Sequence, residues 1–248
     1  MPDPRHLRNA PITEALIDFR VKVPAAFQAE QLAGLKRRLA GQFPKVDERR
    51  GIQVSMGFLR GEFQQPVLGK QALEGYFFKT ADEKTIAQFR ADGFTFNRLR
   101  PYTSWDELFP KAIELWKLYC AISTPEVVTR VAVRYINRIE LPPGATNLEH
   151  YLRTVPVLPP ELPQSVGSFL TRVTIHDAEA DIFCHVSQVS EVRTAARQLS
   201  VILDIDTYKE KEIPIDDPAV EQTFGRLRTL KNLVFFNTLT EQALRLFE

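Results

Sequence analysis

The chain has 248 residues, of which 44% are hydrophobic and 25% are charged, so it can build a sizeable core in one or two domains. Its 32 basic and 31 acidic residues give a formal net charge of +1, which argues against whole-surface attraction to nucleic acid or to acidic membrane. No segment approaches the roughly 18 consecutive apolar residues of a transmembrane helix, and the N-terminus lacks the apolar core of a signal peptide. We therefore expect a cytoplasmic protein without membrane association, and its two cysteines fit a reducing compartment.

The first half of the chain is expected to form a strand, a helix, four further strands and a second helix. Alternation of apolar and polar residues ends at Pro24, and Asp92-Gly93 between two alternating runs is a strong hairpin signal. Ser104 is an expected N-cap, with Glu107 completing a capping box. The expected strands and helices lie at 14–23, 27–43, 52–59, 72–80, 84–91, 94–99 and 105–123.

The second half repeats this order from a strand that begins just after Pro125. A short helix follows, and then four prolines between 155 and 163 predict an extended connector. Asp216-Asp-Pro218 predicts the start of the last helix, with a break near Asn237-Thr238. The expected strands and helices lie at 130–142, 147–153, 168–176, 181–188, 199–208 and 218–247.

These patterns predict an α+β fold with mostly antiparallel sheets and long helices packed on one face. Residues 1–123 and 124–248 would be two similar β-α-β-β-(β)-α halves within one compact unit. We interpret the shared order as an internal duplication; the alternative is two unrelated α+β halves. If the halves are related, Asp18, Arg20 and the segment 134–138 would line one shared surface.

The strand over 130–142 has two faces of opposite character. One face carries Val131, Val133, Tyr135, Asn137, Ile139 and Leu141, which a sheet would lay on its core. The other carries Arg130, Ala132, Arg134, Ile136, Arg138 and Glu140. Asn137 is the polar exception on the apolar face, and a buried amide is expected to bond to a neighbouring backbone group or to a tyrosine hydroxyl.

The polar face supplies the candidate ligand-binding residues, which are Arg20, Arg134, Arg138, Asp204 and Asp206. Three interpretations stay open: a cross-strand ladder of ion pairs, a site for an anion or phosphodiester, and a metal site. Two carboxylates two residues apart on a strand lie about 7 Å apart, a spacing that can hold a hard cation. A ladder would balance the charges, whereas an anion site would leave the arginines in excess.

Other sequence features carry less functional information. Tyr102 and Trp105 beside Asn97-Arg98 could stack a nucleic-acid base, although a hydrophobic staple at the start of the helix over 105–123 explains them as well. The four histidines are scattered, and the sequence holds no Walker loop, no Gly-x-Ser-x-Gly and no His-Glu-x-x-His. No cofactor is expected.

Several blocks of the sequence resemble a known family. They are Asn9-Ala-Pro-Ile-Thr-Glu-Ala15, Asp92-Gly-Phe-Thr-Phe-Asn-Arg98, Pro101-Tyr-Thr-Ser-Trp105, Arg134-Tyr-Ile-Asn-Arg-Ile139 and Leu203-Asp-Ile-Asp206. In this order they are similar to the recurring blocks of a sporadically distributed family of uncharacterised bacterial and archaeal proteins. The resemblance implies no activity, substrate or cofactor. The patchy distribution of that family suits an accessory role in defence or in a toxin–antitoxin system.

We therefore expect a binding or interaction protein whose Arg/Asp-lined sheet face holds a protein partner or a small anionic ligand. The alternative is a metal-dependent enzyme acting on nucleotide or nucleic-acid phosphates, in which Asp204 and Asp206 hold the metal while Arg134 and Arg138 hold phosphate. A nucleic-acid binder without chemistry is a third, less favoured hypothesis. A homodimer through the helices at 105–123 or 218–247 also stays open.

Overall fold

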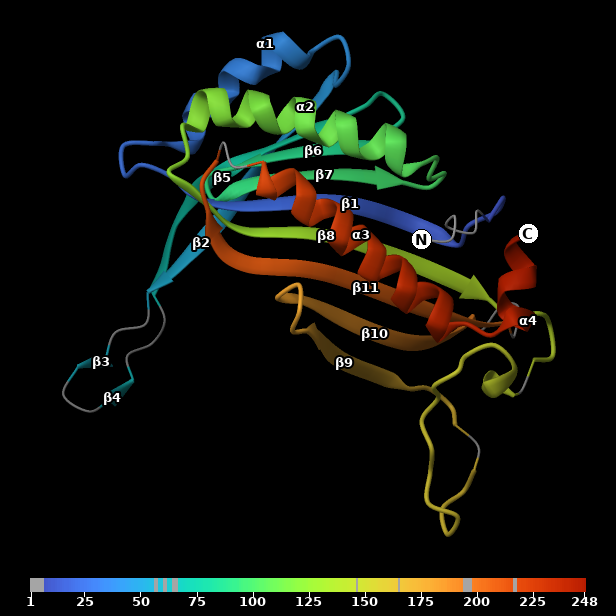
Figure 1. Ribbon diagram of the computed structural model, residues 1–248. Coiled ribbons are helices and arrows are strands. Elements are labelled where there is room, and N and C mark those ends of the chain that lie inside the picture. Colours follow the sequence, from blue (N-terminus) through green and yellow to red (C-terminus); the bar gives the residue numbers. More distant parts are fainter. Residues whose placement is uncertain are drawn as a thin grey trace.

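The computed structural model describes residues 7–55, 58–59, 62–63, 67–145, 147–164, 166–193, 198–215 and 218–248. Nine strands form one sheet in the order β2-β5-β6-β7-β1-β8-β11-β10-β9, and every neighbouring pair is antiparallel (Figure 1). The strands are β1 (Ile12–Lys22), β2 (Lys45–Ser55), β5 (Val67–Lys79), β6 (Thr85–Arg90), β7 (Gly93–Leu99), β8 (Val127–Glu140), β9 (Leu170–Asp177), β10 (Ile182–Arg193) and β11 (Gln198–Ile213). A separate ribbon pairs β3 (Phe58–Leu59) with β4 (Glu62–Phe63).

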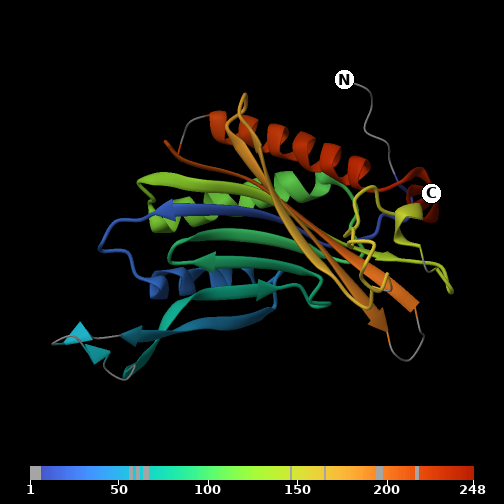
Figure 2. The same cartoon turned by 90° about the horizontal axis from the view of Figure 1, so that it is seen from below.

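The helices cover one face of this sheet. Figure 1 shows α1, α2 and α3 on the same side, and Figure 2 shows the strands from below with α1 and α2 behind them. The helices are α1 (Leu35–Leu39), α2 (Trp105–Ser123), α3 (Ala219–Thr238) and α4 (Glu241–Leu244), with 3-10 turns η1 (Ala29–Gly34), η2 (Leu148–His150) and η3 (Arg245–Phe247). Among the described residues, no helix is long and apolar enough to cross a bilayer.

The mixed α+β class is confirmed, but two of the expected long helices are divided into shorter elements. The segment 27–43 forms the 3-10 turn η1 and the five-residue α1 in place of one helix. Gly34 lies where η1 gives way to α1 and Gly41 follows α1, and glycine is a poor helix former. The terminal segment divides at Leu239 into α3 and α4, close to the expected break. Residues 56–57, within the strand expected at 52–59, and residues 216–217, at the expected start of the last helix, lie outside the described residues.

The second helix and the central strand match their predictions closely. α2 runs from Trp105 to Ser123, and the Ser104 hydroxyl accepts the backbone N–H of Glu107 at 3.2 Å. The predicted apolar face of β8 is buried, including Val131, Val133 and Tyr135. Asn137 is buried as well and donates from Nδ2 to the Leu203 carbonyl at 3.1 Å, which satisfies the amide as expected.

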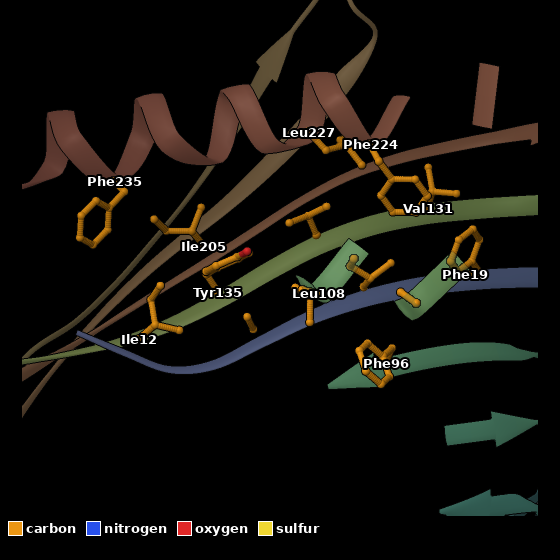
Figure 3. Packing of buried hydrophobic residues seen from close by; sticks show 14 of the residues in the cluster. Ile12, Phe19, Phe96, Leu108, Val131, Tyr135, Ile205, Phe224, Leu227 and Phe235 are labelled. Atoms are coloured by element: carbon orange, nitrogen blue, oxygen red, sulfur yellow. The ribbon is translucent and has the colours of Figure 1, made fainter. Parts of the chain in front are cut away.

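Large aromatic side chains join the sheet to the two longest helices. Phe19 of β1 stacks on Trp116 of α2 with ring centroids 4.1 Å apart, and it contacts Phe224 of α3 at 5.0 Å. Figure 3 shows Phe19 and Phe224 on the same side of the sheet as Val131 and Tyr135. One continuous apolar layer therefore lies between the sheet and both helices, so the two halves of the chain share a core.

The two halves meet at the pair β1–β8 in the middle of the sheet. In the first half, β1 pairs with β7, the last strand before α2; in the second half, β8 pairs with β11, the last strand before α3. β1 and β8 then pair with each other along most of their length, from Ile12↔Asn137 to Lys22↔Val127. The halves thus form a single sheet instead of two separate ones.

Gly93, at the turn between β6 and β7, is required by both its conformation and its surroundings. Its φ of +153° suits glycine, and a Cβ there would lie 2.0 Å from the Phe19 carbonyl oxygen. We expect Gly93→Ala to lower the free energy of unfolding by about 1–3 kcal/mol or more, measured by urea denaturation. Gly41→Ala is the matched control, because nothing lies within 4 Å of the added Cβ. Equal effects of the two substitutions would contradict this explanation.

Candidate functional site

The sheet face opposite the helices carries a network of charged side chains from five adjacent strands. Strand alternation places Asp18 and Arg20 of β1, Arg90 of β6, Thr95 of β7, Arg130 and Arg134 of β8, and Asp204 and Asp206 of β11 on this face. We call it the polar face. It is the surface that the sequence analysis selected.

Asp18 is the centre of the polar face. The residue is 5% exposed, and its carboxylate accepts from Thr95 Oγ1 at 2.5 Å, from Arg90 Nη2 at 3.1 Å, and from Arg20 Nε and Arg130 Nη1 at 3.2 Å each. The side chain of Arg90 is almost fully buried. Its guanidinium also donates to Thr95 and to Asp92, and these bonds fix its position. A buried carboxylate with four donors is a rigid organising element for its neighbours.

The two aspartates of β11 have separate arginine partners. Arg134 donates from Nε and Nη2 to both oxygens of Asp204, at 2.8 and 2.6 Å, in a bidentate pair. Asp206 accepts from Arg130 Nη2 at 3.0 Å, so Arg130 bridges Asp206 and Asp18. Burial raises the pKa of Asp206, and Arg130 and Arg134 oppose that shift. The hydrogen bonds to Asp204 raise the pKa of Arg134.

A hollow of about 570 Å³ lies over this network. Its lining residues are Leu16, Asp18, Arg20, Arg49, Gln88, Arg90, Thr95, Asn97, Arg130, Arg134 and Asp206. Five of them are arginines and two are aspartates, because the other carboxylates approach from outside: Asp204 to Arg134, Asp92 to Arg20, and Glu74 to Arg49. The wider network is close to balanced, while the lining itself is rich in arginine.

The structure brings four of the five predicted site residues to this place. Arg20, Arg134 and Asp206 line the hollow, and Asp204 holds Arg134 from beside it. Arg138 lies elsewhere: it pairs with Glu191 at 2.9 Å, donates to Ser200 Oγ at 3.2 Å and lines a different depression.

Sequence reasoning missed Arg49, Arg90 and Thr95 as members of this surface. Each lies in the first half of the chain and reaches the hollow only because of strand order. β7 and β6 follow β1 in the sheet, which puts Thr95 opposite Asp18 and Arg90 one strand further on. The polar alternation of Gln88 and Arg90 was a usable local signal, but nothing local indicates that β7 pairs with β1.

In the metal hypothesis, a cation would compete with arginines for the carboxylates of Asp204 and Asp206. Asp204 and Asp206 both accept hydrogen bonds from arginines, so a cation would have to displace Arg134 or Arg130. Within the described ranges, no group of three or more histidine, cysteine, aspartate or glutamate side chains is placed to hold a metal ion. The arrangement therefore suits anions better than hard cations.

The second candidate group, Tyr102 and Trp105 beside Asn97-Arg98, makes contacts within the chain. Trp105 stacks on Phe109 with ring centroids 4.9 Å apart, and Tyr102 shares a hydroxyl–hydroxyl hydrogen bond of 2.8 Å with Tyr135. Asn97 is buried and bonds to Glu14 and Gln88. These contacts give the aromatic rings and the amide partners within the chain, which weakens the idea of a base-stacking platform.

Fold and polar face together define an α+β protein built on one antiparallel sheet, with helices on one side and an arginine-rich hollow on the other. Comparison of the chain with protein-family models and with curated proteins gives no match. The resemblance to the sporadically distributed prokaryotic family stays a prediction, as does any role drawn from it.

Proposed function

We propose that this chain is a binding protein, not an enzyme, and that the hollow on its polar face takes an anionic group of its partner. The observation that carries the proposal is that Arg20 and Arg134, which line the hollow, each keep one terminal guanidinium nitrogen without a protein partner in the described part of the chain. Arginine presents a planar set of donors that suits carboxylate and phosphate oxygens.

Two of these arginines have the exposure and free donors that a ligand needs. The side chains of Arg20 and Arg134 are 40% and 41% exposed. Arg20 donates from Nε and Nη1, and Arg134 from Nε and Nη2, so within the described structure each keeps one terminal nitrogen without a protein partner. Because Asp18 and Asp204 already hold the two guanidiniums, a ligand would lose little entropy in ordering them.

Calorimetric titration with pyrophosphate, citrate and a short polyglutamate peptide tests the proposal. We expect at least one of these probes to bind saturably, and Arg20→Gln or Arg134→Gln to weaken that binding about tenfold, as the loss of a charged hydrogen bond would. Arg138→Gln is the matched control, because Arg138 belongs to the same strand as Arg134 but lies outside the hollow. Binding of none of the probes, or equal weakening by the control, would count against the proposal.

The accessory role in defence or in a toxin–antitoxin system implied by the resemblance belongs to the same proposal. In such a role the anionic group would be an acidic segment of a partner protein. The full chain can be used as bait in a pull-down from a lysate of the native host. A partner protein with an acidic segment that the wild-type chain retains and the Arg134→Gln variant does not would support this role.

We also propose that the two halves arose by duplication. The support is topological: each half begins with a strand that pairs with its own last strand, and one of the two longest helices follows that last strand in each half. The antiparallel pair β1–β8 fits a pseudo-two-fold axis through the middle of the sheet. A common origin requires that β1, β7, β6 and β5 superpose on β8, β11, β10 and β9 with α2 on α3, and a mismatch would contradict it.

A further inference from the structure

Another depression lies on the helix side of the sheet, and its lining differs from that of the polar face. It is a cleft of about 240 Å³ between α3, β8, the segment leading into α2 and the N-terminal segment. Its apolar wall includes Ile12, Tyr135 and Phe235, and Figure 3 shows Tyr135 beneath α3 with Ile12 and Phe235 close by. We call it the α3 cleft.

Two cations of α3 face the α3 cleft. Lys231 Nζ lies 3.9 Å from the centroid of the Tyr135 ring, and the Arg228 guanidinium carbon lies 5.2 Å from that of Trp105. Within the described part of the chain neither side chain has an ion-pair or hydrogen-bond partner, in contrast to the arginines of the polar face. Aromatic faces stabilise a cation only in part, so both side chains keep donors for an anion.

The tyrosine pair adds a neutral donor to the α3 cleft. Tyr102 and Tyr135 lie with their hydroxyl oxygens 2.8 Å apart. One of the two donates to the other, which leaves the second proton for a further acceptor. The cleft therefore combines two cationic donors, one hydroxyl donor and an apolar wall, which is the composition of a site for a small amphipathic molecule.

Lys231 gives up its proton more readily than an exposed lysine. Burial, together with repulsion from Arg228, lowers the pKa of Lys231 to about 7. The other charged or titratable lining groups are Tyr135 of β8, Tyr102 and Asp106 near the start of α2, and Arg8 of the N-terminal segment. Burial raises the pKa of both tyrosines, so neither titrates near neutral pH.

We propose that the α3 cleft binds a small organic carboxylate, whose head group contacts Lys231 and Arg228 while its apolar body packs against Ile12 and Phe235. This site is separate from the polar face and does not depend on the function proposed for it. Binding an anion stabilises the ammonium form of Lys231. Proton uptake therefore accompanies binding above neutral pH.

Calorimetric titration of the full chain with benzoate, from about pH 6 to about pH 9, tests the proposal. We expect saturable binding whose affinity is constant below about pH 7 and then falls by up to about tenfold per pH unit, because the ammonium form becomes scarce. Benzyl alcohol lacks the charge and acetate lacks the ring, so both are expected to bind at least about tenfold more weakly than benzoate. Titration with inorganic phosphate, an anion without an apolar body, distinguishes a site that binds any anion from one that also requires an apolar group on the ligand.

Lysine variants make the test specific. Lys231→Met is expected to weaken benzoate binding at least about tenfold, whereas Lys231→Arg should keep binding and lose the decline above pH 7. Lys36→Met is the matched control, because Lys36 Nζ lies over the Tyr76 ring at 4.5 Å but outside the α3 cleft. Arg134→Gln checks that benzoate does not bind on the polar face.

Three results would overturn the proposal: no saturable benzoate binding, binding that survives Lys231→Met, or benzyl alcohol binding as tightly as benzoate. Thermal unfolding of each variant shows whether the protein is folded at the titration temperature. If Lys231→Met is unfolded there, Lys231→Arg decides, because a pH profile unchanged from wild type would then refute the role of the lysine.

Discussion

Replacement of Asp18 by alanine is expected to lower the free energy of unfolding by about 3–5 kcal/mol, the cost of removing one partner from a buried ion pair. Asp18 is 5% exposed and has three arginine partners: Arg20, Arg90 and Arg130. The decisive one is Arg90, whose side chain is 3% exposed. Asp18→Ala would leave this buried charge with only the exposed carboxylate of Asp92. Urea denaturation measures the change.

Asp47→Ala is the control for Asp18→Ala. Asp47 pairs with Lys79 at 2.6 Å, but its side chain is 60% exposed, so the loss should be below about 1 kcal/mol. Asp18→Asn keeps the shape and one acceptor and should fall between the two. A loss from Asp18→Ala as small as that of the control would mean that Arg90 reaches water when its partner is removed.

The substitution Phe19→Ala, at the next residue along the strand, is expected to cost a similar 3–5 kcal/mol for a different reason. The Phe19 ring is fully buried, stacks on Trp116 of α2 and contacts Phe224 of α3. Its removal opens a cavity where the sheet meets both helices, and the rigid surroundings can fill it only in part. The same urea experiment can be followed by tryptophan fluorescence, to which Trp116 and Trp105 both contribute.

Leu233→Ala is the control for this cavity. Leu233 lies on α3 but is 59% exposed, so its truncation should change the free energy of unfolding by less than about 0.5 kcal/mol. Phe19→Leu should lose less than Phe19→Ala, because it leaves a smaller void. If Phe19→Ala matched the Leu233→Ala control, the contacts between β1 and the two helices would not be important for stability.

Local patterns predicted the features of this fold that depend on local chemistry. The bounds of α2 followed from the Ser104 cap and from the break before Pro125, and the two faces of β8 followed from alternation. The helix over 27–43 failed because an apolar spacing of helical period says little about a segment interrupted by Gly34 and ended by Gly41.

The candidate sites could be predicted only in part, because the sequence does not reveal which distant strands pair with each other. Arg90 meets Asp18 across 72 residues of sequence, and only the strand order decides that they are neighbours. Arg138 was assigned to the same site as Arg134 because both share a strand face, yet four residues along a strand carried it out of the hollow. Lys231 gave no signal, because a lysine on a helix ordinarily faces solvent.

Because the pair β1–β8 lies in the middle of the sheet, cleavage of the chain between its two halves would affect the stability of both. A break in the connection between α2 and β8 leaves each fragment with its innermost strand bare along one edge, since β1 and β8 satisfy each other there. Each fragment would also lose part of the apolar layer that Phe19 and Phe224 now share. We therefore expect the halves to behave as complementary fragments instead of autonomous modules. Any segment inserted between them must keep its two ends close enough for β1 and β8 to pair.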